Sequence, residues 1–465
     1  MTQSSSMRLL GLCVGLVGQT IVFCGLSNAQ TNAQTNNDDP ITVSTEHPRL
    51  LLRPARLRLL KRERERSSAR WRQFQTRVEA GPALPEPGFA LALYYQVSGD
   101  AKAGQQAIAW ALRPGAELRQ EALIFDWCQD LLTPAQSTDL IGRLQKALVD
   151  AGDESVSSIR SRVFAAIALY DHVPRGPQQE LDRVVRGWWR GKMLPGLKGG
   201  KWMLARDDAY PFWELLHAVR DNTMIDLRED YARFFKDFPI EHLMSHYPAP
   251  YEGPDSDYYI GTMRKSSGPD LRIAALSRAA EMAMVALDPN APESQVLQGW
   301  LMHERFALHG PMGAPYEFLW ANPYQPGLSY YHVPLAYYNP DFGRLFVRSS
   351  WEGNAKWLGY FDGLMQISQD GELAPVDPKG SGPPILVDEA WVCPAQTARK
   401  FRLKVETAPN VFLVGLEPRR RYQVEIDDEE MYEAAADPGG ILHLELPRSK
   451  ETGVRIRPAT ATKSN

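Results

Sequence analysis

The spacing of apolar residues changes once along this chain, near residue 340. Up to about residue 335, apolar residues recur every three or four positions, which is the spacing of one helix face. From Leu345 onward they alternate or cluster in short runs of β-forming residues, which indicates strands. The chain has 465 residues, more than one core normally fills. We therefore predict a multidomain α+β protein, helical first and strand-rich second.

The helical part predicts stacked antiparallel helix pairs. Pro or Gly separates most of the helical segments, and the pattern between them contains no strong strand signal. Such pairs form either an open solenoid or a closed α/α toroid, and the lack of a fixed-period repeat argues against a tetratricopeptide-type array. The expected helices cover residues 89–95, 105–112, 118–132, 135–148, 157–170, 179–189, 210–220, 227–235, 270–287 and 294–303, after a basic helix from Pro54 through Arg72.

The C-terminal part predicts an antiparallel β-sandwich or a pair of small antiparallel sheets. Turn residues such as Asp437, Pro438 and Gly439 separate its short runs. The expected strands cover residues 345–348, 356–361, 385–387, 401–405, 411–414, 421–426 and 442–446. We place the helical domain at 46–335 and the β-domain at 341–465, and we expect the functional chemistry at the seam between them.

The N-terminal residues have the pattern of a secretory signal peptide. Arg8 precedes an apolar run over residues 9–26, and Ser27-Asn28-Ala29 provides small residues where a signal peptidase cleaves. The alternative is an uncleaved membrane anchor, but several glycines interrupt the run and a polar tail follows it. We expect a signal peptide over 1–29, a polar linker over 30–45, no membrane span after signal removal, and export to the periplasm or the cell exterior.

Charge and cysteine content exclude several functions. The formal charge is −4, or about −5 without the signal peptide, so the chain has no general attraction for nucleic acid and needs a local basic patch to bind a polyanion. The Arg-rich helix that starts at Pro54 offers either such a patch or a solvated face, because Glu63 and Glu65 interleave with its arginines. Only Cys128 and Cys393 follow the signal peptide, too few for a disulfide framework.

A first polar cluster lies between residues 201 and 222. Asp208 suits a helix N-cap, and the helix that follows places Trp213, His217 and Arg220 on one face. That face offers either a sugar-stacking ring, a proton carrier and a carboxylate clamp, or a core histidine with an exposed arginine. The other substrate-binding candidates of this stretch are Trp202, Arg206 and Asn222.

A second polar cluster spans residues 246–261. It holds three carboxylates and four tyrosines with little apolar bulk, which suits either a site or a decorated turn. His246, at its start, is a candidate to neutralise a carboxylate or act as a base. Farther on, residues 310–363 are dense in Trp, Tyr, Pro and Gly, a mixture that suits a carbohydrate surface. The binding candidates there are Trp320, Tyr324 and Tyr330.

Several of these segments resemble heparinase II/III-like polysaccharide lyases. His47-Pro48-Arg49-Leu50-Leu51-Leu52, before a Pro-started helix, is similar to the start of the toroid in that family. Arg348-Ser349-Ser350-Trp351, followed by Ala355-Lys356-Trp357-Leu358-Gly359, is similar to the strand that opens its β-domain. Glu252-Gly253 with Tyr258-Tyr259 resembles its catalytic segment. The resemblance implies an α/α toroid with a β-sandwich, β-elimination at a uronic acid, and Tyr258 or Tyr259 as catalytic acid and base, oriented by Glu252.

The chain departs from that family at two places. After Phe361-Asp362-Gly363, where these lyases carry a histidine-rich segment that contributes to the site and to a zinc, residues 364–373 contain no histidine. Asp207-Asp208-Ala209-Tyr210 stands where they tend to carry an asparagine-histidine pair.

Three functions therefore stay open. The first is a lyase that cleaves an acidic glycan by β-elimination, and the second is a glycan-binding protein of the same fold without catalysis. The third is an α/α-toroid glycoside hydrolase that uses two carboxylates. The candidate carboxylates are Asp207, Asp208, Glu214, Glu252, Asp255 and Asp257.

The sequence predicts no cofactor and no metal. It contains no phosphate-binding glycine loop, nucleophile elbow or dinucleotide fingerprint. His242 and His246 have the i, i+4 spacing of a zincin helix, but the glutamate and third ligand of that motif are missing from the local sequence. We expect a polysaccharide or oligosaccharide as the partner and no nucleic acid; the oligomeric state is not predictable from the sequence.

Overall fold

The computed structural model describes residues 40–81, 84–149, 152–254, 257–262, 270–303, 309–395, 398–449 and 451–459. The expected signal peptide, and the expected linker up to residue 39, lie outside these ranges. Within them, none of the helices combines the length and the apolar character that a bilayer crossing requires.

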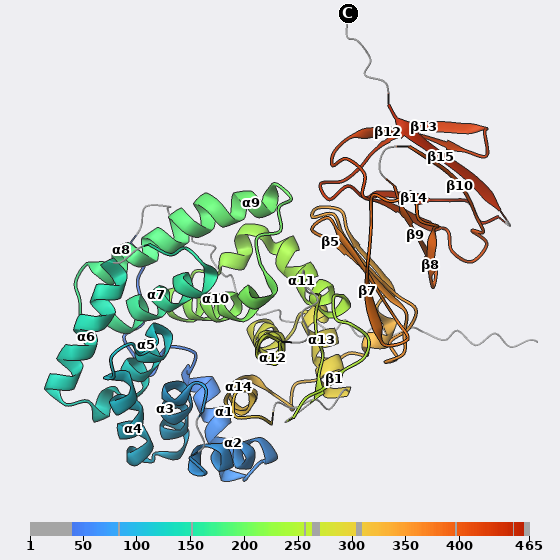
Figure 1. The fold of residues 1–465 in the computed structure, drawn as a ribbon. Helices are drawn as coiled ribbons and strands as arrows, with labels where there is room; N and C mark the ends of the chain where they lie inside the picture. Colours follow the sequence, from blue (N-terminus) through green and yellow to red (C-terminus); the bar gives the residue numbers. More distant parts are fainter. Residues whose placement is uncertain are drawn as a thin grey trace, which may run out of the picture. The chain divides into compact units, whose positions relative to one another are not determined.

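From Pro54 to Trp320 the described chain is helical, apart from one two-stranded hairpin (Figure 1). The α-helices are α1 (Pro54–Glu65), α2 (Ala69–Glu79), α3 (Pro87–Ser98), α4 (Ala101–Ala111), α5 (Leu118–Trp127), α6 (Pro134–Val149), α7 (Val156–Leu169), α8 (Gly176–Asp182), α9 (Leu194–Lys198), α10 (Ala209–Thr223), α11 (Ala232–Met244), α12 (Leu271–Leu287), α13 (Pro292–His303) and α14 (Gly313–Trp320). Single-turn helices η1 (Gln129–Leu131), η3 (Arg206–Asp208), η4 (Leu227–Tyr231) and η5 (Tyr330–His332) and the π-helical η2 (Arg183–Met193) connect them.

The expected helical segments fall mainly on observed helix, and two differences have local reasons. The basic helix ends at Glu65 rather than Arg72, because Ser67 adopts a positive φ of 50° and the Ser68 hydroxyl caps a new helix by accepting from the Trp71 amide at 3.2 Å. The second difference is α14, which occupies part of the stretch expected to be a carbohydrate surface. All of its residues are buried, so most aromatic rings of that stretch belong to the core.

The strands begin at Ala336, earlier than the first expected strand (Figure 1). They are β3 (Ala336–Asn339), β4 (Arg344–Arg348), β5 (Trp357–Phe361), β6 (Leu364–Gln369), β7 (Glu372–Val376), β8 (Ile385–Val387), β9 (Ala390–Pro394), β10 (Arg399–Leu403), β11 (Asn410–Val414), β12 (Arg421–Ile426), β13 (Glu430–Ala435), β14 (Leu442–Glu445) and β15 (Thr452–Pro458). The remaining two strands, β1 (Tyr251–Glu252) and β2 (Asp257–Tyr258), form the hairpin within the helical part.

The C-terminal strands form three sheets. Their orders are β3-β4-β5-β6-β7, β14-β11-β9-β8 and β10-β15-β12-β13. Pairing between the described strands is antiparallel, as expected, except that β9 and β11 run parallel. The chain is thus a mixed α+β protein with a helical N-terminal part and mainly antiparallel sheets after it.

Helix α11 joins the helical part to the first of these sheets. Arg344 at the start of β4 places its Nε 2.6 Å from Oε1 of Glu241 on α11. The Asn339 amide donates to the other oxygen of Glu241 at 2.8 Å, and the Trp357 indole donates to the Met244 carbonyl at 2.9 Å. Because Glu241 and Arg344 are both buried, their ion pair fixes how α11 lies against β4.

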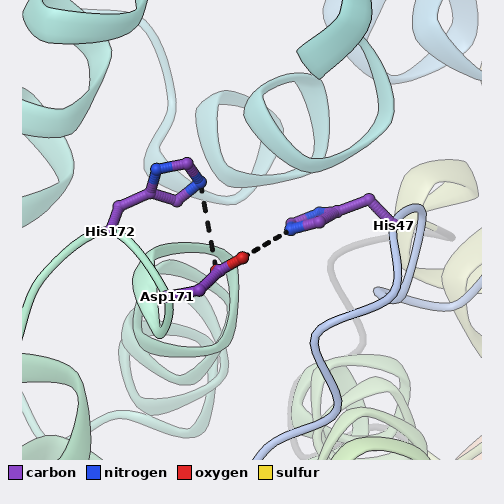
Figure 2. A group of neighbouring side chains, drawn as sticks. All are labelled: His47, Asp171 and His172. Atoms are coloured by element: carbon purple, nitrogen blue, oxygen red, sulfur yellow. Dashed lines mark hydrogen bonds and ion pairs between the residues drawn. The ribbon is translucent and has the colours of Figure 1, made fainter.

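The segment before α1 is held to α5 and α7 by histidine and carboxylate groups. Asp126 accepts hydrogen bonds from the Arg49 and Leu50 amides at 2.9 Å each and lies 2.6 Å from Nδ1 of His47. On the other side, His47 Nε2 is 3.3 Å from Asp171, which also lies 3.9 Å from His172 (Figure 2). The HPRLLL segment is therefore a structural anchor.

The His47 contacts predict a pH-dependent contribution to stability. Burial alone would lower the pKa of His47, but the hydrogen bond and charge of Asp126 outweigh it and raise the pKa above 6.5. A raised folded-state pKa gives stability that is complete below the unfolded pKa and is lost as the pH rises through the folded one. His47→Gln is expected to cost about 1 to 3 kcal/mol at pH 5.5 and clearly less at pH 8.5, measured by urea unfolding. A cost that is equal at both values would contradict this assignment.

Candidate functional site

A pocket of about 540 Å³ lies where η3, α11 and the first sheet meet; we call it the seam pocket. Trp202, Arg206 and His242 line it from the helical part, and Arg344 and Asp362 line it from the strands. It therefore combines two arginines, carboxylates, a histidine and an aromatic ring at one opening.

Arg206 is the most informative residue of the seam pocket. Its Nη1 donates to the Ser245 hydroxyl and its Nη2 to Nε2 of His246, each at 2.8 Å. Its Nε is buried without a hydrogen-bond partner, and no carboxylate within the described ranges forms an ion pair with it. Burial lowers the pKa of Arg206 to about 10, so the guanidinium is still charged at neutral pH. It is a half-buried cation whose Nε donor is buried and unpaired at the pocket wall.

Gly261 allows Arg206 to take this position. A Cβ at residue 261 would lie 2.0 Å from Cζ of Arg206, so only glycine leaves room for the guanidinium against the backbone. Thr262, the next residue, lines the seam pocket itself. The chain that leaves the tyrosine-rich hairpin therefore forms the surface on which Arg206 rests.

Two histidines and a glutamate lie behind Arg206. The Nε2 atoms of His242 and His246 are each 3.0 Å from Oε1 of Glu281 on α12. Burial is the main cause that lowers the pKa of both imidazoles, for His242 to about 3, so both are neutral at pH 7. The Glu281 carboxylate keeps a lowered pKa, because the two histidines outweigh the effect of its burial.

Through its Nε2 atom, His246 can form a hydrogen bond with only one of Arg206 and Glu281 at a time. With the proton on Nδ1 it donates to the His242 carbonyl at 2.9 Å and accepts from Arg206 at Nε2. With the proton on Nε2 it can donate to Glu281 instead, but then it no longer accepts from Arg206. The position of this proton is thus coupled to whatever else Arg206 binds.

The same three side chains form one of two groups of possible metal ligands among the described residues. The ligand atoms of His242, His246 and Glu281 converge within 4.8 Å, so α12 supplies a third ligand that the local sequence does not reveal. The guanidinium of Arg206 lies 2.8 Å from one ligand nitrogen, where its charge opposes a cation. As arranged, the group fits a hydrogen-bonded network with Arg206 better than a metal centre. A second group, His47, Asp171 and His172, belongs to the anchor before α1 (Figure 2).

Trp202 is largely occupied by protein contacts. Its ring stacks on Phe238 with centroids 5.7 Å apart, and the Arg344 guanidinium lies 4.3 Å from its centre. Arg344 in turn is neutralised by Glu241. Trp202 and Arg344 therefore shape the seam pocket, while Arg206 provides its uncompensated charge.

The tyrosine candidates lie close in sequence to Gly261, against which Arg206 packs, but they do not line the seam pocket. Tyr258 is 7% exposed in β2, and Tyr259 packs its half-buried ring edge-on against Trp300 at 5.1 Å. Trp300 also contacts the His246 ring at 5.2 Å. Glu252 is exposed in β1. The structure thus brings the tyrosine segment near the Arg206 network without placing a phenol at the pocket wall.

Several other candidates are buried in the helical core. His217 has Nε2 3.0 Å from the Ala283 carbonyl, and burial lowers its pKa. The Asn222 amide donates to the Ala218 carbonyl at 2.8 Å. Trp320 is 2% exposed, and its indole donates to the Tyr210 hydroxyl at 2.9 Å. The remaining members of this buried group are Trp213 and Tyr330.

Two candidates meet in a different cavity, and one is at the surface. Arg220 and Trp320 both line a cavity enclosed by α1, α10, α12, α13 and the end of α14. Tyr324 is 59% exposed and lies near Arg66, with 5.9 Å between guanidinium and ring centre. The aromatic candidates therefore do not gather in one groove among the described residues.

The carboxylate candidates are also dispersed. Asp207 lines the seam pocket, and Asp208 accepts from the Ala205 amide at 2.9 Å. Glu214 is fully buried between arginines. Glu252 and Asp257 are exposed in the hairpin, and Asp255 lies outside the described residues. Of the candidates that the structure describes, Asp207 alone reaches the seam pocket.

No protein-family model matches the chain, and a search of curated proteins finds no match.

Proposed function

We propose that this chain is an exported polysaccharide lyase-like protein, with an α/α toroid and a β-sandwich, that binds a uronate-containing glycan in the seam pocket and cleaves it by β-elimination. The observation that carries this proposal is Arg206, a half-buried cation at the pocket wall with an unpaired, buried Nε and no carboxylate within ion-pair distance in the described chain. Arginine suits a carboxylate because its planar fork donates two parallel hydrogen bonds.

The chemistry needs that cation first. Removal of the C5 proton of a uronate builds negative charge on the carboxylate, and a fixed positive group lowers the energy of this state. A carboxylate that binds Arg206 competes with His246 for its donors, which favours the His246 tautomer that donates to Glu281. Substrate binding would thereby rearrange one proton inside the network before reaction.

The resemblance to the lyases assigns the proton transfers to Tyr258 or Tyr259. Tyr259 is two positions before Gly261, against which Arg206 packs, a distance of at most about 7 Å along the backbone. Arg206 therefore packs against the same stretch of chain that carries the tyrosine pair. Glu252 faces the same hairpin from β1, where its register partner is Asp257.

A second candidate is a glycan-binding protein of the same architecture without catalysis. It is favoured by the burial of Tyr258 and by β6, which holds no histidine where the lyases carry their histidine-rich segment. In this case Arg206 binds the carboxylate of the uronate, but no side chain removes its C5 proton.

Absorbance at 232 nm, the signal of an unsaturated uronate, distinguishes the lyase from the glycan-binding protein. The purified chain is incubated with alginate, heparan sulfate, chondroitin and polygalacturonate, beside a Tyr258→Phe, Tyr259→Phe double variant, and binding is followed by affinity electrophoresis. A lyase gives unsaturated uronate from one of these polymers, and the double variant is expected to lose about 100-fold or more of that rate. Retardation without product would establish the binding protein, and neither signal with any polymer would reject both.

A further inference from the structure

The cavity enclosed by the helices differs from the seam pocket in composition and shares no lining residue with it. Its volume is about 850 Å³, within the range of pockets that hold small organic ligands. Its charged lining consists of six arginines and two carboxylates, a formal excess of four positive charges in a chain whose net charge is −4. The arginines are Arg53, Arg56, Arg58, Arg70, Arg220 and Arg278.

The two carboxylates of the lining offset only part of this charge, and two of the arginines pair with glutamates outside the lining: Arg70 with Glu63 at 2.9 Å and Arg278 with Glu281 at 3.8 Å. Asp221 is shared, since it lies 2.8 Å from Arg220 and 3.7 Å from Arg53. Glu317, the other carboxylate of the lining, lies on α14. The positive charge is therefore concentrated on the α1 side of the cavity.

Three arginines on that side retain donors for a ligand. Arg56 makes one hydrogen bond to the Leu319 carbonyl at 3.1 Å and lies 4.3 Å from the Trp320 ring centre, with no ion pair in the described ranges. Burial lowers its pKa to about 10, and the charge of Asp221 offsets this only in part. Arg58 is exposed, and Arg70 has a buried Nε without a partner although its Nη2 binds Glu63. Such groups bind oxyanions well because each guanidinium is a preformed fork.

The rest of the lining favours an organic anion over a free oxyanion. Leu59, Met282, Val285 and Leu301 supply apolar surface, and the volume far exceeds that of one sulfate. A sugar ring presents apolar C–H faces as well as polar edges, so a sugar with charged substituents matches both kinds of wall. A ligand with more than one anionic group matches the positive charge that remains after Glu63 and Glu281 are counted.

From these observations we infer that the helical cavity is a second anion site that binds a short oligosaccharide carrying several sulfate or carboxylate groups. It is independent of Arg206, so it stands whether or not the seam pocket cleaves glycans. The Arg-rich face of α1 is thus the local basic patch that an acidic protein needs to hold a polyanion.

The test is isothermal titration of the full chain with a heparin hexasaccharide in 150 mM NaCl. It is made in an Arg206→Ala background, so that the seam pocket does not contribute its cation. Arg58→Glu and Arg62→Glu are compared, because both positions are exposed on α1 and carry the same charge change, but only Arg58 lines the cavity. Arg58→Glu is expected to weaken binding roughly tenfold or more, and Arg62→Glu less than about threefold. Arg56→Gln is a second lining variant and is expected to weaken binding in the same direction.

Three results would overturn the inference. Equal losses for Arg58→Glu and Arg62→Glu would show attraction to the whole basic face. If the hexasaccharide binds no more tightly than inorganic sulfate, or no more tightly than the neutral maltohexaose, an anionic oligosaccharide is ruled out as the ligand of this cavity. Undetectable binding before the α1 substitutions are made would reject the site. A chain that is inactive at 232 nm but shows the Arg58-specific loss keeps this site and loses the proposed lyase function.

Discussion

Glu214→Ala is expected to destabilise the protein by about 3 to 5 kcal/mol, a large share of the stability of an ordinary domain. Glu214 is fully buried and accepts from Nε of Arg119 at 2.9 Å and from its Nη2 at 2.6 Å. It also binds Nη1 of Arg160 and accepts from the Tyr210 hydroxyl at 2.6 Å. Alanine leaves two buried guanidinium groups with too little negative charge, and that desolvation cost is not recovered elsewhere.

Urea unfolding followed by circular dichroism measures this effect. Glu214→Gln retains a hydrogen-bonding oxygen but not the charge, so a smaller loss of about 1 to 3 kcal/mol is expected. Glu252→Ala is the matched control, because that glutamate is exposed and should change stability by less than about 0.5 kcal/mol. A cost below about 1 kcal/mol for Glu214→Ala would show that the arginines relax to solvent, and it would return Glu214 to the carboxylate candidates.

Arg206→Ala is expected to lower kcat/KM on a uronate polymer by about 100- to 1,000-fold, if the seam pocket is a lyase site. The guanidinium is the only cation of the pocket lining, within the described chain, that has no carboxylate partner, so no neighbour replaces it. Arg206→Lys keeps the charge but loses the fork, and a partial rescue is expected. The measurements are the initial rate at 232 nm and, for a binding protein, the dissociation constant.

Gly261→Ala tests the same idea without altering Arg206. The added Cβ would lie 2.0 Å from Cζ of Arg206, and the flexible guanidinium is the group that must move. We expect most of the loss seen in Arg206→Ala, with a melting temperature close to that of the parent chain. Full activity in Gly261→Ala would show that the position of Arg206 is not critical. A similar rate for Arg206→Ala and the parent would remove Arg206 from the mechanism.

The order of elements could be predicted from sequence because it depends on local patterns. The spacing of apolar residues changes from a helical to an alternating pattern close to where η5 ends and β3 begins. Expected strands such as 421–426 agree with observed strands, here β12. The strands that were missed include β6 and β7. Their residues, as in Leu364–Gln369, mix exposed and buried positions without a clean alternation, so pairing with β5 determines them.

The partners of the candidate residues could not be predicted, because they come from distant parts of the chain. Arg206 was a candidate from its local context, but the His246 contact and the Glu281 carboxylate depend on how α11 and α12 pack. Arg344 carried no signal at all, since a charged residue at a strand start is usually solvated. Aromatic density was misleading for a related reason: Trp320 and Tyr330 are in the core because the helices around them close over their rings.

The Glu241–Arg344 ion pair limits how this protein can change over evolution. A substitution at either residue leaves the other as a buried charge without its partner, which destabilises the fold. Selection against instability therefore removes such variants before any effect on ligand choice matters. Ala205 and Asp207 line the same pocket but are exposed, and they can be exchanged without such a cost. The seam pocket therefore combines residues that are fixed by folding with rim residues that can be exchanged, so new ligand preferences can arise at the rim alone.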